Sequence, residues 1–134
     1  VVSTAKNGPG QRVNSECTPT GKHQICAKFG KNAPVNTVFV GRKATGEIYS
    51  SALAEQHPQR DWILSRIMWL EGIEPGHNVG DHVDTKARFI YIHGTPDDVI
   101  LGQPDSRGCI RMANDDVLQL YDFVDINTQV LITD

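Results

Sequence analysis

The chain has 134 residues, about the length of one domain, and its 39% of hydrophobic residues can build a core without a structural metal or a cofactor. Its net charge of −3 and its isoelectric point of about 5.9 argue against a nucleic-acid-binding surface. No apolar run approaches the ~18–20 residues that cross a bilayer, so the sequence predicts one domain, residues 1–134, without a membrane span.

The start of the chain carries no recognisable export signal. Residues Val1–Lys6 contain no initiator methionine, no basic stretch and no apolar segment followed by a cleavage site. We therefore expect a clipped start, and the compartment has to be argued from function.

The cysteines Cys17, Cys26 and Cys109 are odd in number, so at least one thiol stays unpaired within the chain. Cys17 and Cys26 could close a short loop as a disulfide. Two free thiols are the alternative, and the spacing leaves both possibilities open.

The first half of the chain has the turn and strand patterns of a β-sheet. Turn residues surround the partly alternating run 23–29, which we interpret as a strand that follows a section of short strands and turns. The β-branched and aromatic run 37–40 and the segment 47–49 are predicted to form a hairpin, with Thr45 and Gly46 in its turn.

Two predicted elements lie in the middle of the chain. The apolar residues of 60–70 recur at helical spacing, with Pro58 before them and Gly72 after them, and they predict a helix. Residues 87–92 are predicted to form a buried strand that runs directly into His93-Gly94-Thr95-Pro96, whose glycine and proline end it.

The last part of the chain predicts a helix and a strand. Asn114 can cap a helix that continues to Val124, because its apolar residues follow the 3.6-residue period. Residues 128–133 then predict a closing strand. Several short strands with only two short helices favour a mainly β fold, a β-sandwich or a barrel-like sheet.

The residues most suited to chemistry lie in two segments, His93-Gly94-Thr95 and Ser106-Arg107-Gly108-Cys109-Ile110-Arg111. A cysteine attacks as the thiolate, and a nearby imidazole or guanidinium lowers the pKa of the thiol. Gly108 lets the backbone approach a ligand, so that amides around Cys109 could face a developing oxyanion. Arg111 could hold an anionic group of a substrate or favour the thiolate.

Each of these residues also has a purely structural interpretation. A single cysteine is most often a small buried apolar side chain, and a histidine at a strand end is more often a capping or surface residue than a base. Arg111 could pair with Asp115 or Asp116. The residue pattern alone leaves a cysteine–histidine enzyme and a structural role both open.

Together the two segments resemble the signature of the L,D-transpeptidase catalytic domain family (YkuD type) of bacterial cell-wall enzymes. In that family a strand-end histidine precedes a Ser-x-Gly-Cys-x-Arg block. The stretches 3–10 and 18–21 also look like segments of the family, so the resemblance covers essentially the whole chain. The family's domain usually begins with a further pair of strands, and their absence here fits a clipped start.

The resemblance implies a role for each matching residue. Cys109 matches the nucleophile, and His93 matches the residue that takes its proton and later acts as an acid. Arg107 stands where many members have histidine, which leaves no second histidine at that position. The third member of the triad is commonly a backbone carbonyl or a small hydroxyl, which the sequence does not assign. The positions expected to shape the nucleophile loop and bind the substrate are Ser106, Arg107, Gly108, Arg111, Gly94 and Thr95.

The resemblance also implies an activity without a cofactor or a metal. The cysteine would attack the bond between diaminopimelate and the terminal D-alanine of a peptidoglycan tetrapeptide stem and form a thioester. An amine from a second stem would give a 3→3 cross-link, and a lipoprotein lysine would give a protein-to-wall link. Carbapenems are expected to acylate the same cysteine. Such a substrate implies the periplasm or the cell wall as the location.

Two other functions fit the same residues. Water in place of the amine would make the protein an L,D-carboxypeptidase. A cleft that holds stems without acyl transfer would make it a non-catalytic peptidoglycan-binding module, although the presence of both His93 and Cys109 speaks against this.

Several other side chains have weaker alternatives. His77 and His82, with Asp81 or Cys109, could supply zinc ligands, but their spacing fits none of the usual ligand pairs, and a solvated loop is expected. We expect His23 and His57 at the surface. The two tryptophans, Trp62 and Trp69, are expected to share a helix face and pack the core, with sugar stacking as the alternative.

Overall fold

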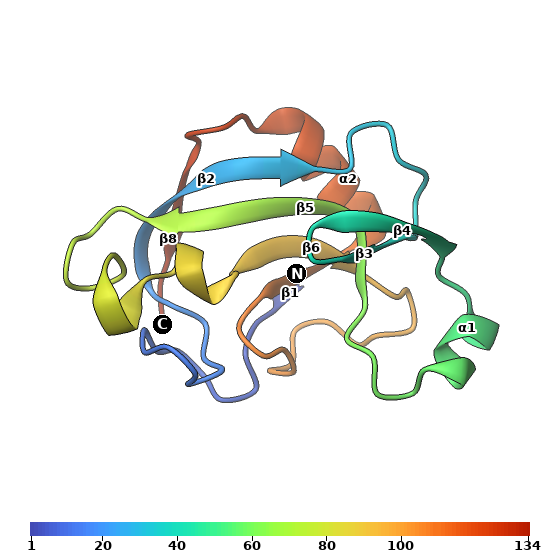
Figure 1. The fold of residues 1–134 in the computed structure, drawn as a ribbon, viewed down its shortest axis with the longest axis horizontal. Coiled ribbons are helices and arrows are strands. Elements are labelled where there is room, and N and C mark those ends of the chain that lie inside the picture. The colour runs from blue at the N-terminus through green and yellow to red at the C-terminus, as the bar shows by residue number, and fades with distance from the viewer.

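Eight strands form one strongly curled sheet in the computed structural model, which describes residues 1–134 (Figure 1). The strands are β1 (Val2–Ser3), β2 (Gly21–Phe29), β3 (Thr37–Val40), β4 (Lys43–Ile48), β5 (Ile63–Gly72), β6 (Tyr91–Thr95), β7 (Ile110–Ala113) and β8 (Gln129–Ile132). Their order is β1-β7-β6-β5-β2-β8, and β3 joins β5 to β4. The predicted mainly β, barrel-like fold with two short helices is confirmed.

The two α-helices differ in their relation to the sheet. Helix α2 (Asn114–Phe123) lies behind the sheet in the view of Figure 1 and packs on β5, β6 and β7. Helix α1 (Ser51–Gln56) lies at the periphery and buries none of its residues. Its first turn is stabilised by Ser50, whose Oγ accepts a hydrogen bond from the amide of Leu53. No helix is long and apolar enough to cross a membrane.

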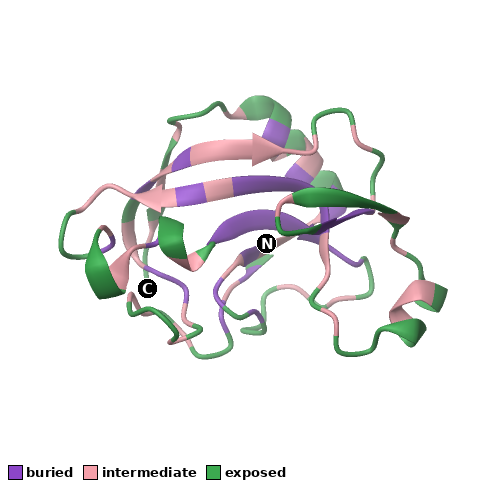
Figure 2. Ribbon diagram, viewed as in Figure 1, coloured by how far each residue is buried: buried purple, intermediate pink, exposed green.

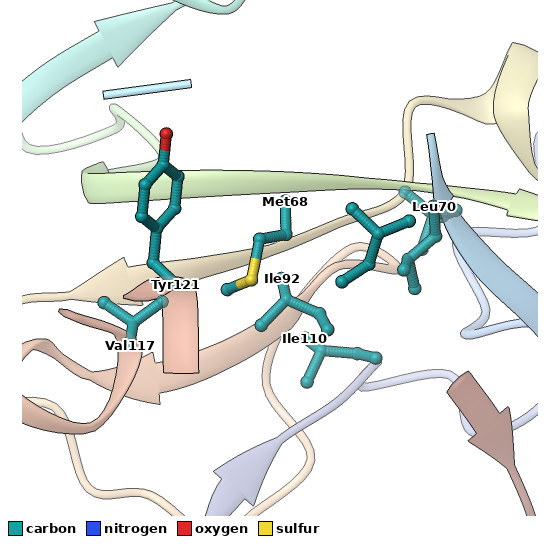
Figure 3. Packing of buried hydrophobic residues seen from close by; sticks show 8 residues of the cluster. Met68, Leu70, Ile92, Ile110, Val117 and Tyr121 are labelled. Carbon is teal, nitrogen blue, oxygen red and sulfur yellow. The ribbon is translucent and has the colours of Figure 1, made fainter. Parts of the chain in front are cut away.

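The main hydrophobic core lies between α2 and the sheet. Figure 2 shows that burial is concentrated along the central strands, whereas the peripheral turns are exposed. Figure 3 shows the core side chains of α2 gathered with those of the strands in one continuous cluster. Its eight buried members are Ile25, Met68, Leu70, Ile90, Ile92, Ile110, Val117 and Tyr121.

A second, smaller cluster covers the opposite face of the central strands. Successive residues of a strand point to opposite faces. Met68 and Ile92 therefore belong to the main core, while their neighbours Ile67 and Tyr91 pack with Phe39 of β3 in the second cluster. The central strands are consequently buried on both faces.

The predicted helix over 60–70 is wrong, because these residues form most of β5. A central strand covered on both faces carries an almost continuous apolar run, which does not alternate with period two. A bulge also breaks the alternation, because Leu64 pairs with Gly94 whereas Ile67 pairs with His93. Helix α1, which the sequence analysis missed, precedes this strand.

The predicted strand over 87–92 is displaced. Residues Lys86–Arg88 form a 3₁₀ turn, and Phe89 adopts a left-handed conformation with φ of 57°, which delays the strand until Tyr91. Strand β6 then continues through His93 to Thr95, so the histidine lies inside the strand rather than at its end.

The first hairpin is confirmed, but its turn lies elsewhere. Strands β3 and β4 pair antiparallel, and the two connecting residues are Gly41 and Arg42 instead of Thr45 and Gly46. Both connecting residues have positive φ, 57° and 66°, as a two-residue hairpin turn of type I′ requires. The strands predicted at 23–29 and 128–133 and the last helix are confirmed as β2, β8 and α2. The predicted cap by Asn114 is wrong, because Asn114 is the first helical residue, Ala113 is the N-cap, and no side chain caps the helix.

The expectation that His23 lies at the surface is wrong. Its ring is fully buried, with Nδ1 3.0 Å from the carbonyl oxygen of Gly21 and Nε2 3.0 Å from Oγ1 of Thr85. Burial lowers the pKa of His23. The buried ring is tolerated because both nitrogens have partners, a feature that the sequence pattern does not reveal. His57 is exposed, as expected.

The tryptophans share no helix face, because the segment from Ile63 onward forms strand β5. Trp69 lies in β5 beside the second cluster and packs edge-on against Tyr91 at 6.1 Å between ring centroids. Trp62 precedes β5 and packs against Tyr49 at 5.0 Å. Only Trp69 packs against the hydrophobic interior.

We predict that Leu70→Ala lowers the free energy of unfolding by about 2–5 kcal/mol, because Leu70 is fully buried in the main core and its truncation leaves a cavity. Leu131→Ala is the matched control, since this leucine is 66% exposed and its truncation should cost no more than about 0.5 kcal/mol. Urea unfolding of both variants measures the difference. Equal losses would contradict the assignment of the core.

Candidate active site

Parallel pairing of β6 with β7 brings the two sequence motifs together. The register places His93 opposite Arg111 and Ile92 opposite Ile110. Cys109 immediately precedes β7 and therefore lies beside Tyr91 at the start of β6. Segments far apart in the sequence thus lie on adjacent strands.

Strand alternation places the reactive side chains on one face. Ile92 and Ile110 point into the main core, so His93 and Arg111, which follow them in the two strands, point to the opposite face. Cys109 packs against the second cluster on this same face. The fold therefore presents the cysteine, the histidine and the arginine together.

The loop before Cys109 is locked by Ser106. Its Oγ donates a hydrogen bond to the carbonyl oxygen of Cys109 at 2.6 Å and accepts one from the amide of Gly108 at 3.2 Å. Gly108 has a φ of 129°, and its carbonyl oxygen accepts a hydrogen bond from Oγ1 of Thr18. A side chain at this position would press against Ile90, so glycine is required here.

The thiol of Cys109 is half-buried and contacts the backbone of the segment before His93. The amide of Tyr91 donates a hydrogen bond to Sγ at 3.3 Å, and Sγ lies 3.5 Å from the carbonyl oxygen of Phe89, to which it can donate. Burial raises the pKa of Cys109 to about 12, and Asp61 acts in the same direction. The Tyr91 amide and the nearby guanidinium groups lower the pKa by less. The resting sulfur is therefore a thiol, not the thiolate that the sequence pattern suggested.

The ring of His93 is fully buried and oriented by its own backbone. Nδ1 lies 2.7 Å from the carbonyl oxygen of Gly94, and since a carbonyl only accepts, Nδ1 carries the proton. Nε2 makes no hydrogen bond, and none joins it to Sγ of Cys109. Burial lowers the pKa of His93, so the ring is a neutral imidazole with an unshared electron pair on Nε2.

The Gly94 carbonyl is thus the hydrogen-bond partner that orients the imidazole. The sequence did not assign this partner. Gly94 is itself in close contact with Leu64 and Asn114, because an added Cβ would overlap the carbonyl oxygen of the first and Oδ1 of the second. Asn114 accepts a hydrogen bond from Ser65, in the bulge of β5, at 2.7 Å. Helix α2 and the β5 bulge together fix the backbone that orients the histidine.

Arg111 is held by two carboxylates. Its Nη1 donates to Asp105 at 2.6 Å, and its Nη2 donates to Asp61 at 3.0 Å. The alternative pairing with Asp115 or Asp116 does not occur. Asp61, in the loop before β5, was missed by sequence reasoning, because nothing in its neighbourhood marks it as a partner of a residue so distant in the chain.

Two hollows are bordered by arginines of the Cys109 segment, although Cys109 and His93 themselves line neither of them. One, of about 150 Å³, is lined by Thr95 and Arg111 together with Asp61. The other, of about 270 Å³, is lined by Phe89 and Arg107. The predicted substrate-binding residues Thr95, Arg107 and Arg111 border these hollows, whereas Ser106, Gly108 and Gly94 are buried in the supporting backbone.

The residues considered as zinc ligands do not assemble. His77 lies 3.3 Å from Oγ1 of Thr20, His82 is exposed, and no group of three His, Cys, Asp or Glu side chains is placed to hold a metal ion. All three cysteines are free thiols, so Cys17 and Cys26 form no disulfide.

Comparison with known protein families identifies the fold and its motifs. Residues 1–132 match the family model of the L,D-transpeptidase catalytic domain, YkuD. The chain belongs to this L,D-transpeptidase catalytic domain family. The resemblance inferred from the sequence motifs is thereby confirmed.

Two curated relatives match this chain over only part of their own length. YqjB of Bacillus subtilis is 39% identical over 71 residues, which are 48% of this chain and 40% of YqjB. YbiS of Escherichia coli, named a probable L,D-transpeptidase, is 28% identical over 108 residues, 80% of this chain and 35% of YbiS. The chain therefore spans less than half the length of these relatives.

A solved structure has the same fold. L,D-transpeptidase 3 from Mycobacterium tuberculosis, in complex with a faropenem-derived adduct, superimposes with a TM-score of 0.55 at 17% identity. The match covers 99% of this chain and 43% of the other. The curled sheet of this L,D-transpeptidase domain is thus the fold of its family.

We predict that Cys109 is alkylated by iodoacetamide at a rate that still rises between about pH 8 and about pH 10, because its raised pKa keeps the thiolate fraction small. The measurement uses the Cys17→Ser and Cys26→Ser double variant, in which Cys109 is the remaining thiol. Free cysteine serves as the reference and should level off earlier. A plateau below about pH 7 would indicate a preformed thiolate and contradict the prediction.

Proposed function

We propose that residues 1–134 are the catalytic domain of a cysteine L,D-transpeptidase that acts on peptidoglycan tetrapeptide stems. The carrying observation is the unpartnered Nε2 of a neutral His93, on the strand face that also presents Cys109. A free proton acceptor on the same strand face as a partly exposed thiol supports nucleophilic catalysis over a structural role for the cysteine.

The first step is acylation of the thiol. Sγ of Cys109 attacks the carbonyl carbon that joins diaminopimelate to the terminal D-alanine, and its proton moves to Nε2 of His93. The C–N bond then breaks, and His93 returns the proton to the nitrogen of the departing D-alanine. Because burial disfavours the charged form of both groups, the proton moves during the attack rather than before it.

The tetrahedral intermediate carries negative charge on the former carbonyl oxygen. The amide of Cys109, which precedes β7, donates no hydrogen bond at rest and can donate to this oxygen. The amide of Gly108 is already bonded to Ser106, so Ser106 would keep the loop in shape while the Cys109 amide serves as the donor.

The second step transfers the acyl group from the thioester to an amine, and forms a 3→3 cross-link or anchors a protein to the wall. A joining enzyme needs space for two peptides, and two separate hollows are bordered by residues of the Cys109 segment, one by Arg111 and the other by Arg107. Transfer to water, which would make the protein an L,D-carboxypeptidase, needs only one. A non-catalytic binding module would have no use for an oriented, unpartnered imidazole.

Reactive β-lactams are expected to acylate the same sulfur. A faropenem-derived adduct is present in the structurally similar L,D-transpeptidase of M. tuberculosis. Carbapenems present a strained acyl group of the same kind, and we expect one of them to modify Cys109. A peptidoglycan substrate places the working enzyme in the periplasm or the cell wall.

We predict that Cys109→Ala abolishes conversion of a disaccharide-tetrapeptide and formation of a carbapenem adduct, because no other residue supplies the nucleophile. His93→Ala should lower the acylation rate by about 10²–10⁴-fold, the usual contribution of a general base. Mass spectrometry distinguishes the products: a cross-linked dimer indicates a transpeptidase, and a tripeptide indicates a carboxypeptidase.

Cys26→Ala is the matched control, since this thiol lies outside the site and should leave turnover unchanged. An adduct that persists in Cys109→Ala, or a wild-type acylation rate in His93→Ala, would overturn the assignment of that residue. Unchanged stems with the wild-type chain would favour the binding module.

A further inference from the structure

The positive charge of the Arg111 guanidinium is outweighed by the negative charges of its two partners. One positive group is bound by two carboxylates, Asp105 and Asp61, so the cluster carries a net charge of −1. The adjacent Arg60 does not reverse this, because it is paired with Glu47 at 2.8 Å. An anionic substrate group, which the sequence analysis assigned to Arg111, would meet a negative rather than a positive centre.

Asp61 has an oxygen available for a ligand. Oδ1 accepts the hydrogen bond from Arg111, whereas Oδ2 makes none. The side chain is 38% exposed and lines the hollow that also contains Thr95. Asp105, at 55% exposed, lies outside that lining. Asp61 is therefore the carboxylate that faces the hollow.

The unpartnered imidazole of His93 links this carboxylate to the reaction centre. His93 is the cross-strand partner of Arg111, which holds Asp61, and its ring is fully buried with Nε2 unbonded. The charge of Asp61 also acts on the pKa values of both His93 and Cys109, as expected for a group close to the pair. A cation bound to Asp61 would therefore be separated from the base by one side chain, that of Arg111.

We propose that Asp61 binds the ammonium group of the incoming acceptor amine and positions it beside His93. This inference rests on the proposed function. It adds a reason why the acyl-enzyme would react with an amine rather than with water. A primary amine is mostly protonated at neutral pH, so a site for the acceptor has to recognise a cation. A carboxylate with one free oxygen provides that recognition.

Transfer of the acyl group to an amine in this position requires the amine to lose two protons. The ammonium loses one proton to Nε2 of His93, which releases it to water, and the neutral nitrogen attacks the thioester carbonyl carbon. A C–N bond forms and the C–S bond breaks. The second proton leaves the nitrogen and ends on Sγ of Cys109, so the resting thiol is restored.

The test measures how the acyl-enzyme partitions between amine and water. The chain is acylated with a disaccharide-tetrapeptide, which also serves as the acceptor, and the ratio of cross-linked dimer to tripeptide is read by mass spectrometry. In Asp61→Asn we expect the ratio to fall about tenfold, as for loss of one charge-assisted hydrogen bond. Asp61→Glu, which keeps the carboxylate, should recover most of the ratio.

Hydroxylamine separates recognition of charge from general damage, because this nucleophile is uncharged at neutral pH. Its hydroxamate-to-tripeptide ratio should be the same in Asp61→Asn and wild type. Glu55→Gln removes an exposed carboxylate of helix α1 outside the cluster and is the matched control, with the wild-type ratio expected for both nucleophiles.

The outcomes separate the two proposals. A wild-type dimer ratio in Asp61→Asn, or an equal fall with hydroxylamine, would overturn the ammonium site and leave the proposed function intact. A fall in acylation alone, with an unchanged ratio, would assign Asp61 to the donor peptide and also overturn it. A wild-type chain that forms no thioester would overturn the proposed function itself.

Discussion

The parallel pairing of β6 with β7 is the constraint on which the site depends. It sets His93 opposite Arg111 and places Cys109 beside Tyr91, whose amide holds the sulfur. A slip of the register by one residue would move the histidine to the core face, since side chains alternate along a strand. The main core on that face, with Ile92 and Ile110 as members, therefore also secures the register of the reactive groups.

Burial, rather than charge pairing, determines the state of the two reactive groups. It raises the pKa of Cys109 and lowers that of His93, so both rest in the neutral form. The Gly94 carbonyl orients the imidazole without adding a charge. A neutral pair of this kind resembles an alcohol–imidazole pair in its chemistry, with the proton transferred as the bond to the substrate forms.

The mainly β fold and the family could be predicted from the sequence, because turn residues and the His93 and Cys109 segments carry local signals. Predictions from the sequence were wrong where contacts with distant residues determine the structure instead of the local residue pattern. Residues 60–70 have helical spacing, yet become a strand because both faces are buried. His23 looks exposed, yet its ring is buried and one of its two partners, Thr85, comes from a distant part of the chain. The role of Asp61 depends on an ion pair across fifty positions, which no local pattern encodes.

Nitrogen NMR of the imidazole of His93 tests the central claim most directly, because the two ring nitrogens report protonation separately. A neutral imidazole bonded to the Gly94 carbonyl predicts a protonated Nδ1 and an unprotonated Nε2 at neutral pH in the unliganded protein. A doubly protonated ring, as in a thiolate–imidazolium pair, or a proton on Nε2 alone would contradict it.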